Sequence, residues 1–335
     1  MKCHPEHRQQ HRQHHRQREK GAALLVVLGL VAVIAGWAST AAYEDMLSLR
    51  RAENSLDSNK AELACLSALE LIKQGLIQDA KEGQIDSLDE QWAQSAPPFP
   101  VDNGLVAGSI EDANRYLNIN DLINVQGKVD MTMLPVFQRL FTQQQLDVRL
   151  IDALIDWMDA DSTPFGYAGA EDDSYFNQKY RVKNAMLDRF QELRFIQGFD
   201  DATLQVLKSS LRVWQRRSGT FSHVNVNTAE SSVLLAMFPL MTEADFQKIT
   251  LHRPYQQLTT LQQATWAQGA VAQTMVSHLS VASDVFIVKT HAIFGRSDRT
   301  ETFGLARQGT KLTWLWRERI LWQAPTTPIN KAGQP

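Results

Sequence analysis

An acidic stretch between residues 156 and 175, DWMDADSTPFGYAGAEDDSY, carries the residue types best suited to chemistry. Its six carboxylates belong to Asp156, Asp159, Asp161, Glu171, Asp172 and Asp173. Pro164, Gly166 and Gly169 separate two acidic clusters and allow the chain to fold back on itself. Grouped carboxylates repel one another unless a cation lies between them, and a flexible loop of oxygen ligands suits calcium, which accepts ~6–8 oxygens. No cysteine or histidine lies in the stretch, which argues against zinc or copper.

Two other interpretations of this acidic stretch must be compared with calcium binding. The carboxylates are also suited to capping helices and to a solvated loop, and their spacing is not that of an EF-hand. Paired carboxylates also serve in acid–base or metal-assisted catalysis. However, the chain has no glycine-rich phosphate loop and no serine in a glycine-flanked elbow, and its histidines outside the first 20 residues are scattered. We therefore expect no enzyme, while calcium and a solvated loop both stay open.

The segment REKGAALLVVLGLVAVIAGWA, residues 18–38, indicates a membrane helix. From Gly21 to Ala42 there are 22 residues without a charge, and about 20 apolar residues span a bilayer. The first 20 residues contribute a net charge of +4, so the positive-inside rule places them in the cytoplasm and the body in the periplasm. The stretch WASTAA, which ends at Ala42, resembles a signal-peptidase site, so cleavage there also stays open.

The residues after Ala42 predict that the same helix continues. The next 38 residues contain no proline and one glycine, and apolar side chains recur three or four positions apart in the second half. We expect one helix of more than fifty residues whose far end docks on a globular body. The whole chain has a net charge of −3, so the part after residue 20 carries −7. An acidic body disfavours nucleic acid as a partner.

The remaining residues predict a helical block placed between strands. Residues 85–108 read as a loop and 109–123 as a short strand followed by a turn. Helices are predicted over 130–160, 179–217 and 224–266, where Asn227 is placed to cap a helix with Glu230 three residues on. Residues 285 to 323 alternate in hydrophobicity and predict three antiparallel strands. A sheet whose strands flank a helical block implies an α+β fold with an insertion.

The basic leader, Lys20-Gly21 and the following AALLVVLGLVAVIAG resemble the N-terminus of type IV prepilins. In that superfamily a prepilin peptidase cuts after the glycine, which implies processing at Gly21, a methylated N-terminus at Ala22 and Leu24, Leu25, Gly29 and Gly36 in the helix that assembles in the membrane. Most members carry a glutamate at the fifth mature position, where this chain has Val26. That departure resembles the minor pseudopilin K family of type II secretion systems.

The resemblance to the protein K family covers nearly the whole chain and also rests on RYLNIND, on the acidic stretch and on VNVNTA. It implies an α+β pseudopilin fold, in which a long N-terminal transmembrane helix packs on a small antiparallel sheet with a large inserted α-helical domain. The implied parts are a prepilin leader (1–21), a transmembrane helix (22–42), the pseudopilin helix and first strand region (43–125), the inserted α-domain (126–280), C-terminal strands (281–323) and a disordered tail (324–335).

The resemblance also implies a function without catalysis. The protein would cap the pseudopilus tip and support export of folded proteins across the outer membrane, anchored once in the inner membrane. Its partners would be minor pseudopilins I and J, other type II secretion components and the prepilin peptidase. Because the family binds calcium in its α-domain, a structural calcium ion is expected. We hypothesise ligands from Asp159, Asp161, Glu171 and Asp172, completed by backbone carbonyls.

The segment from VNVNTA to ITLHRPYQQLTTL also resembles a helix-hairpin-helix unit, which grips DNA phosphates in uptake proteins. The corresponding turn, MFPLMT at 237–242, has no glycine and no adjacent lysine or arginine. Backbone amides approach phosphate less easily without glycine. We therefore expect a packing module and no nucleic acid, while a minor pilin-like protein of a DNA-uptake or type IV pilus system remains the alternative function.

Overall fold

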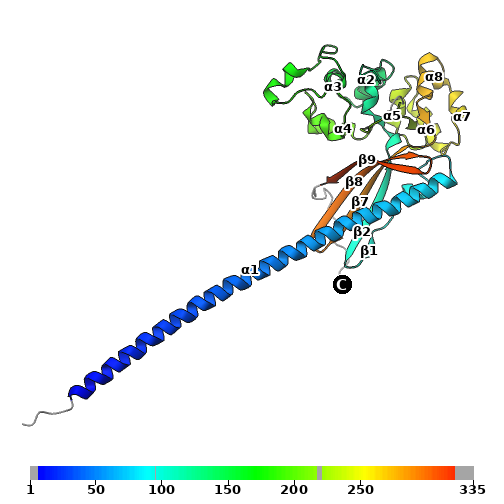
Figure 1. Ribbon diagram of the computed structural model, residues 1–335. Coiled ribbons are helices and arrows are strands. Elements are labelled where there is room, and N and C mark those ends of the chain that lie inside the picture. The colour runs from blue at the N-terminus through cyan, green and yellow to red at the C-terminus, as the bar shows by residue number, and fades with distance from the viewer. Residues whose placement is uncertain (1–6, 95, 217–220, 321–335) are drawn as a thin grey trace, which may run out of the picture.

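A single helix dominates the computed structural model, which describes residues 7–94, 96–216 and 221–320 (Figure 1). Helix α1, His7–Glu82, has 76 residues and confirms the prediction of one helix longer than fifty. Among the described residues, one helical segment, Ala23–Glu82, contains a stretch long and apolar enough to cross a membrane. The predicted tail at 324–335 and the first six residues of the predicted leader lie outside the described residues.

A five-stranded antiparallel sheet packs against the second half of α1. The strand order is β1-β2-β7-β8-β9. The strands are β1 Phe99–Val101, β2 Gly104–Asp112, β7 Val285–Phe294, β8 Ser297–Gln308 and β9 Lys311–Ile320. Leu69 and Leu76 of α1 are fully buried against Phe286, Val288 and Phe303 on one face of the sheet. The three predicted C-terminal strands, and the α+β fold class, are thereby confirmed.

The strand β2 begins earlier than the sequence suggested, because Gly104 and Gly108 lie in a strand rather than in a loop. A Cβ atom on Gly108 would lie 2.8 Å from Cδ1 of Ile72, and one on Gly104 would lie 2.5 Å from the carbonyl oxygen of Ile293. Both glycines therefore allow close packing against a neighbouring element, a role that glycine also has in strand interiors.

The helical block is inserted between two strands that pair with each other, since Asp112 of β2 lies opposite Phe286 of β7. It lies at the end of the sheet beside the C-terminal end of α1, away from the projecting half of that helix (Figure 1). Its α-helices are α2 Leu134–Gln143, α3 Leu150–Met158, α4 Asp201–Leu207, α5 Ser231–Met237, α6 Glu243–Leu251, α7 Thr259–Gln262 and α8 Ala270–Val276. The 3₁₀ helices are η1 Gln91–Ala93, before the insertion, and η2 Ala113–Arg115, η3 Ile119–Leu122, η4 Asp172–Gln178, η5 Phe190–Phe195 and η6 Thr265–Ala267 within it.

Two short parallel strand pairs close the inserted domain. β3 Leu117–Asn118 pairs with β4 Leu211–Arg212, and β5 Val224–Asn225 pairs with β6 Leu279–Ser280. The single helix expected over 130–160 is broken into α2 and α3, because Gln145 adopts a left-handed conformation with φ of +58°. These pairs and helices surround one apolar core that is separate from the core beneath α1.

The predicted capping role of Asn227 is wrong. Helix α5 begins three residues later, after Glu230, and no side chain caps it. The Asn227 amide instead donates to the carbonyl oxygens of Tyr255 (3.0 Å) and Val281 (3.3 Å), while its oxygen accepts from the Tyr255 backbone N–H (2.7 Å). Asn227 thus joins segments far apart in the sequence, which a local capping pattern does not reveal.

Candidate metal centre and polar junction

The acidic loop is shaped by two carboxylates of helix α3. Asp156 accepts a hydrogen bond from the Phe165 backbone N–H (2.7 Å), and Asp152 accepts from the N–H groups of Tyr167 and Ala168 (3.1 Å each). A Cβ atom on Gly166, whose φ is +63°, would lie 2.5 Å from Oδ2 of Asp152. The loop therefore folds back over α3 as predicted, and glycine is needed where the backbone approaches a carboxylate.

Three of the four predicted calcium ligands converge. Asp159, Asp161 and Glu171 each direct one carboxylate oxygen into a group whose atoms lie within 4.8 Å of one another. Asp159 is 4% exposed and Glu171 is 9% exposed, while Asp161 lies at the surface. Oδ1 of Asp159 and Oε1 of Glu171 are buried and have no hydrogen-bond partner among the described residues. Buried unsatisfied carboxylate oxygens are costly, so this donor set fits a hard cation such as calcium.

The electrostatics of the group agree with this geometry. Burial, followed by the neighbouring charges of Asp161 and Asp156, raises the pKa of Asp159 to about 6. Burial likewise raises the pKa of Glu171 to about 7, with the charges of Asp156 and Asp159 as the next causes. A bound cation would reverse both effects, because it stabilises the ionised form of each carboxylate.

The fourth predicted ligand, Asp172, lies outside this group of three. Its Oδ1 accepts a hydrogen bond from the Val182 backbone N–H (3.0 Å), and its Oδ2 lies 3.8 Å from Nε of Arg181. Asp172 still adds negative charge beside Glu171. The other acidic residue of this pair, Asp173, is exposed at the start of η4.

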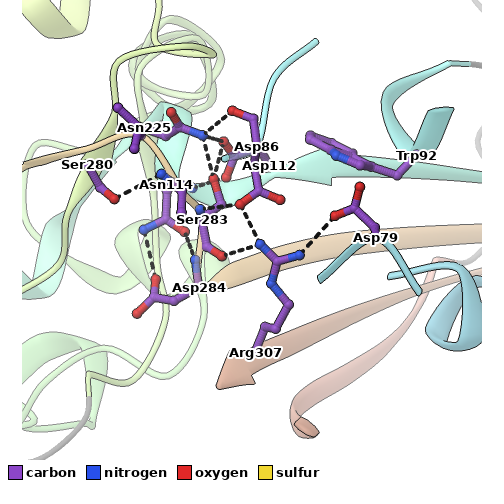
Figure 2. A network of polar contacts seen from close by, with 12 residues as sticks. Asp79, Asp86, Trp92, Asp112, Asn114, Asn225, Ser280, Ser283, Asp284 and Arg307 are labelled. Carbon is purple, nitrogen blue, oxygen red and sulfur yellow. Dashed lines mark hydrogen bonds and ion pairs between the residues drawn. The ribbon is translucent and has the colours of Figure 1, made fainter. Parts of the chain in front are cut away.

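A second polar centre, which the sequence did not reveal, joins the inserted domain to the sheet (Figure 2). At its middle is the carboxylate of Asp112, the last residue of β2. Its Oδ2 accepts from the hydroxyls of Thr228 (2.5 Å) and Ser283 (2.7 Å) and from the Asn225 amide (3.3 Å), and its Oδ1 accepts from the Asn114 N–H (2.8 Å). All five residues are buried. We call this group, with the ion pairs described next, the polar junction.

The polar junction extends to the end of α1 through Arg307 of β8. The Arg307 guanidinium forms ion pairs with Asp79 (3.1 Å) and with Asp86, and it donates to the carbonyl oxygen of Ser283 (2.9 Å). Asp86 also accepts from the Ser283 backbone N–H (2.7 Å). Asp79, Asp86 and Glu90 form the second group of three acidic side chains among the described residues, but Arg307 already neutralises part of its charge.

The predicted assembly residues lie along the projecting half of α1. Leu24, Leu25 and Val26 are exposed, and a Cβ atom on Gly29 or Gly36 would meet nothing within 4 Å. Gly29 and Gly36 are seven residues apart and so share one face of the helix. The backbone of Gly21 and Ala22 lies within α1, with no break at the predicted processing site.

These features define a class of protein. A long helix that leaves one apolar half unpacked and docks its other half on an antiparallel sheet is the architecture of a pilin-like subunit. Here the sheet is interrupted by a helical domain that carries the acidic group. The crystal structure of the GspK–GspI–GspJ complex from the enterotoxigenic Escherichia coli type 2 secretion system shares this fold, with a TM-score of 0.71 and 19% identity, over 81% of this chain and 100% of that one.

Sequence comparison identifies the family. A profile described as "Type II secretion system (T2SS), protein K" matches residues 115–216, which include the acidic loop. Type II secretion system protein K of Pseudomonas aeruginosa is 30% identical over 66% of this chain and 69% of its own length. Type II secretion system protein K of Pectobacterium carotovorum is 29% identical over 90% of this chain and 96% of its own length. The chain belongs to the type II secretion system protein K family and is a minor pseudopilin, a structural component of the secretion machinery.

Proposed function

We propose that this minor pseudopilin caps the tip of the pseudopilus together with minor pseudopilins I and J, and thereby supports export of folded proteins across the outer membrane. The position of the inserted domain carries the proposal. It lies beside the C-terminal end of α1, at the end of the molecule away from the apolar half (Figure 1). In a filament of parallel helices, the next subunit would occupy that space, so a subunit of this shape fits the terminal position.

Val26 also supports a position at the tip of the pseudopilus. A carboxylate within the bilayer is costly unless it is paired, so the glutamate that most pilin-like subunits carry there requires a partner on a neighbouring subunit. A terminal subunit does not need that pairing. The exposed apolar side chains and the face with Gly29 and Gly36 would pack against neighbouring helices.

The anchor would cross the inner membrane once, with the basic leader in the cytoplasm and the body in the periplasm. The excess of basic residues before Gly21 supports this orientation. Prepilin peptidase would cleave after Gly21, and Ala22 would become the methylated N-terminus.

Calcium would stabilise the acidic loop. Asp159, Asp161 and Glu171 would supply carboxylate ligands, and Asp172 would contribute charge from outside the group. The ion would satisfy the buried oxygens of Asp159 and Glu171 and hold the loop on α3. This role is structural, and we expect the protein to have no catalytic activity.

The hairpin between α5 and α6 gives no support to DNA uptake as the function. Arg139 of α2 contacts the backbone at the start of this hairpin. Its Nε donates to the carbonyl oxygen of Ala236 (2.7 Å), and its Nη2 donates to the carbonyl oxygen of Met237 (3.4 Å). The Arg139 guanidinium is therefore engaged by backbone carbonyls, which disfavours phosphate binding to it.

The test is complementation of a strain that lacks the gene, with exoprotein secretion as the readout. Gly21→Ala should block processing and secretion, whereas Gly75→Ala should not, because a Cβ there meets nothing within 4 Å. Mass spectrometry of the mature protein should find Ala22 at the N-terminus only when the peptidase is present. Normal secretion with Gly21→Ala would refute the proposal, and loss of transformation or twitching instead of secretion would support the alternative function.

A further inference from the structure

A groove of about 450 Å³ lies between the sheet and the inserted domain, on the sheet face opposite α1. Side chains alternate between the two faces of the sheet along each strand, and this shows which residues form the floor of the groove. Phe286 and Val288 of β7 pack beneath α1, so Ile287 and Lys289 point to the other face, where both line the groove. The opposite wall is formed by η5 and by the segment around β4, through side chains such as Phe190. Ligand pockets typically occupy ~300–1,000 Å³, so this groove has room for a few residues of peptide.

The groove contains a flat aromatic surface built by a pair of facing residues. Trp316 of β9 lies opposite Gly304 of β8. A Cβ atom on Gly304 would lie 2.4 Å from Nε1 and 2.6 Å from Cε2 of the Trp316 indole. The indole therefore lies over the glycine, where any other residue would displace it. It remains half-buried rather than sealed in a core, which leaves aromatic surface for a bound side chain.

The charged side chains around the groove are not balanced. Two of its three acidic residues are neutralised in ion pairs, Glu111 with Arg212 (2.7 Å) and Asp188 with Lys183 (2.7 Å). The third, Glu318, keeps its charge and accepts from the neutral Gln191 amide (2.8 Å).

Three further basic residues of the groove, Arg189, Lys208 and Lys289, are exposed. Among the described residues, no carboxylate forms an ion pair with any of them. These cations stand out because the chain after residue 20 carries a net charge of −7. The charge of the groove is therefore complementary to an acidic ligand.

The walls of the groove are held in place before any ligand binds. Arg212 lies with its guanidinium 3.8 Å from the centre of the Tyr116 ring while it pairs with Glu111 across the two domains. The polar junction fastens the inserted domain to β2 and β8 (Figure 2). A preorganised site loses less entropy on binding, so the groove is suited to a short flexible segment.

We propose that this groove binds a short acidic peptide segment of a partner protein, with one aromatic or aliphatic side chain resting on Trp316 and carboxylates beside Lys208 and Lys289. The aromatic surface, the free cations and the limited volume together select this chemistry over a basic or nucleic-acid ligand. The site is on the opposite side of the sheet from α1 and is thus separate from the helix contacts proposed for filament assembly.

The test uses the full chain in micelles of an uncharged detergent and two dye-labelled pentapeptides. One has a central phenylalanine flanked by four glutamates, and the other has four lysines instead. Fluorescence anisotropy should show saturable binding of the acidic peptide and none of the basic one. Lys208→Glu with Lys289→Glu should weaken the acidic peptide about tenfold. The matched control, Lys128→Glu with Lys311→Glu, changes the net charge equally at exposed positions outside the groove and should leave the affinity unchanged.

Several outcomes would overturn the proposal. They are equal binding of both peptides, equal weakening by the control pair, and binding that does not weaken when salt rises from about 0.05 M to about 0.5 M. Loss of copurification with minor pseudopilins I and J in the groove variant alone would assign the groove to the tip interface instead. Loss of self-association in that variant alone would assign it to a second copy of this chain.

Discussion

Replacing Asp112 with alanine should loosen the inserted domain without unfolding either part of the protein. The substitution removes the acceptor for four buried donors, which belong to Asn114, Asn225, Thr228 and Ser283. The Asn225 amide and the Thr228 hydroxyl keep other acceptors. The Asn114 N–H and the Ser283 hydroxyl are left unpaired, at a cost of ~1–3 kcal/mol each. Part of this cost is offset, because burial raises the pKa of Asp112 to about 6 and its ionised form is itself disfavoured. We expect a net loss of about 3 kcal/mol in the free energy of local opening.

Hydrogen exchange with mass spectrometry on the full chain measures this opening directly. A loss of about 3 kcal/mol should speed exchange about 100-fold in peptides containing 225–228 and 283–286, with the sheet core unchanged. Asp200→Ala is the control, since it removes only the α4 cap on the Thr203 N–H (2.7 Å) and should affect α4 alone. Exchange at both junction segments within about threefold of the wild type would refute the view that Asp112 fastens the domain.

The carboxylate of Asp112 also predicts that the stability of the polar junction depends on pH. Its pKa rises from an ordinary value of 3.8 to about 6, so the folded state binds this proton more tightly than the unfolded state. Stability therefore falls as the pH rises from about 4 to about 6. Between pH 7 and pH 5, intrinsic-rate-corrected exchange at the junction should slow by about tenfold in the wild type. Asp112→Asn should remove this difference, and an unchanged pH response in that variant would assign it to other groups.

Three further predictions concern the loop, the groove and the anchor. Glu171→Gln should abolish the rise in melting temperature that calcium produces, whereas Asp173→Asn, at an exposed neighbouring position, should keep that rise. If calcium raised the melting temperature of both variants, Glu171 would be excluded as a ligand. Gly304→Ala should displace Trp316, lower stability by about 1–3 kcal/mol and weaken the acidic peptide, as thermal unfolding and anisotropy would show. Val26→Glu should leave exoprotein secretion nearly unchanged, because an added carboxylate can still pair with an amine; lost secretion would contradict a terminal position.

Local periodicity was sufficient to predict the long helix and the C-terminal strands. The apolar residues of α1 recur at helical spacing up to Leu76, and those of β7 alternate, so both elements follow from contacts that repeat along the chain. The acidic loop was predictable for a similar reason, since its turn residues and carboxylates lie within 20 residues of one another.

Glycine and asparagine misled the same reasoning where a tertiary contact decided their role. Gly104 and Gly108 suggested a loop, but they lie in β2 because neighbouring elements approach too closely for a side chain. Asn227 matched a helix cap, but its amide bonds Tyr255 and Val281, more than 25 positions along the chain. The sequence could not show that Glu171 joins the predicted calcium ligands while Asp172 does not. Adjacent side chains leave the backbone in different directions, and only the fold decides which one faces the group.

The sequence by itself determined the membrane helix, the class of fold and the acidic loop, because each depends on residues close together along the chain. Only the tertiary structure decided the polar junction and the groove. Asp112 meets Thr228 and Ser283, and Glu111 meets Arg212, across about one hundred or more intervening residues. Hydrogen bonds of this kind depend on distances of about 3 Å, which only the packing of the two domains sets.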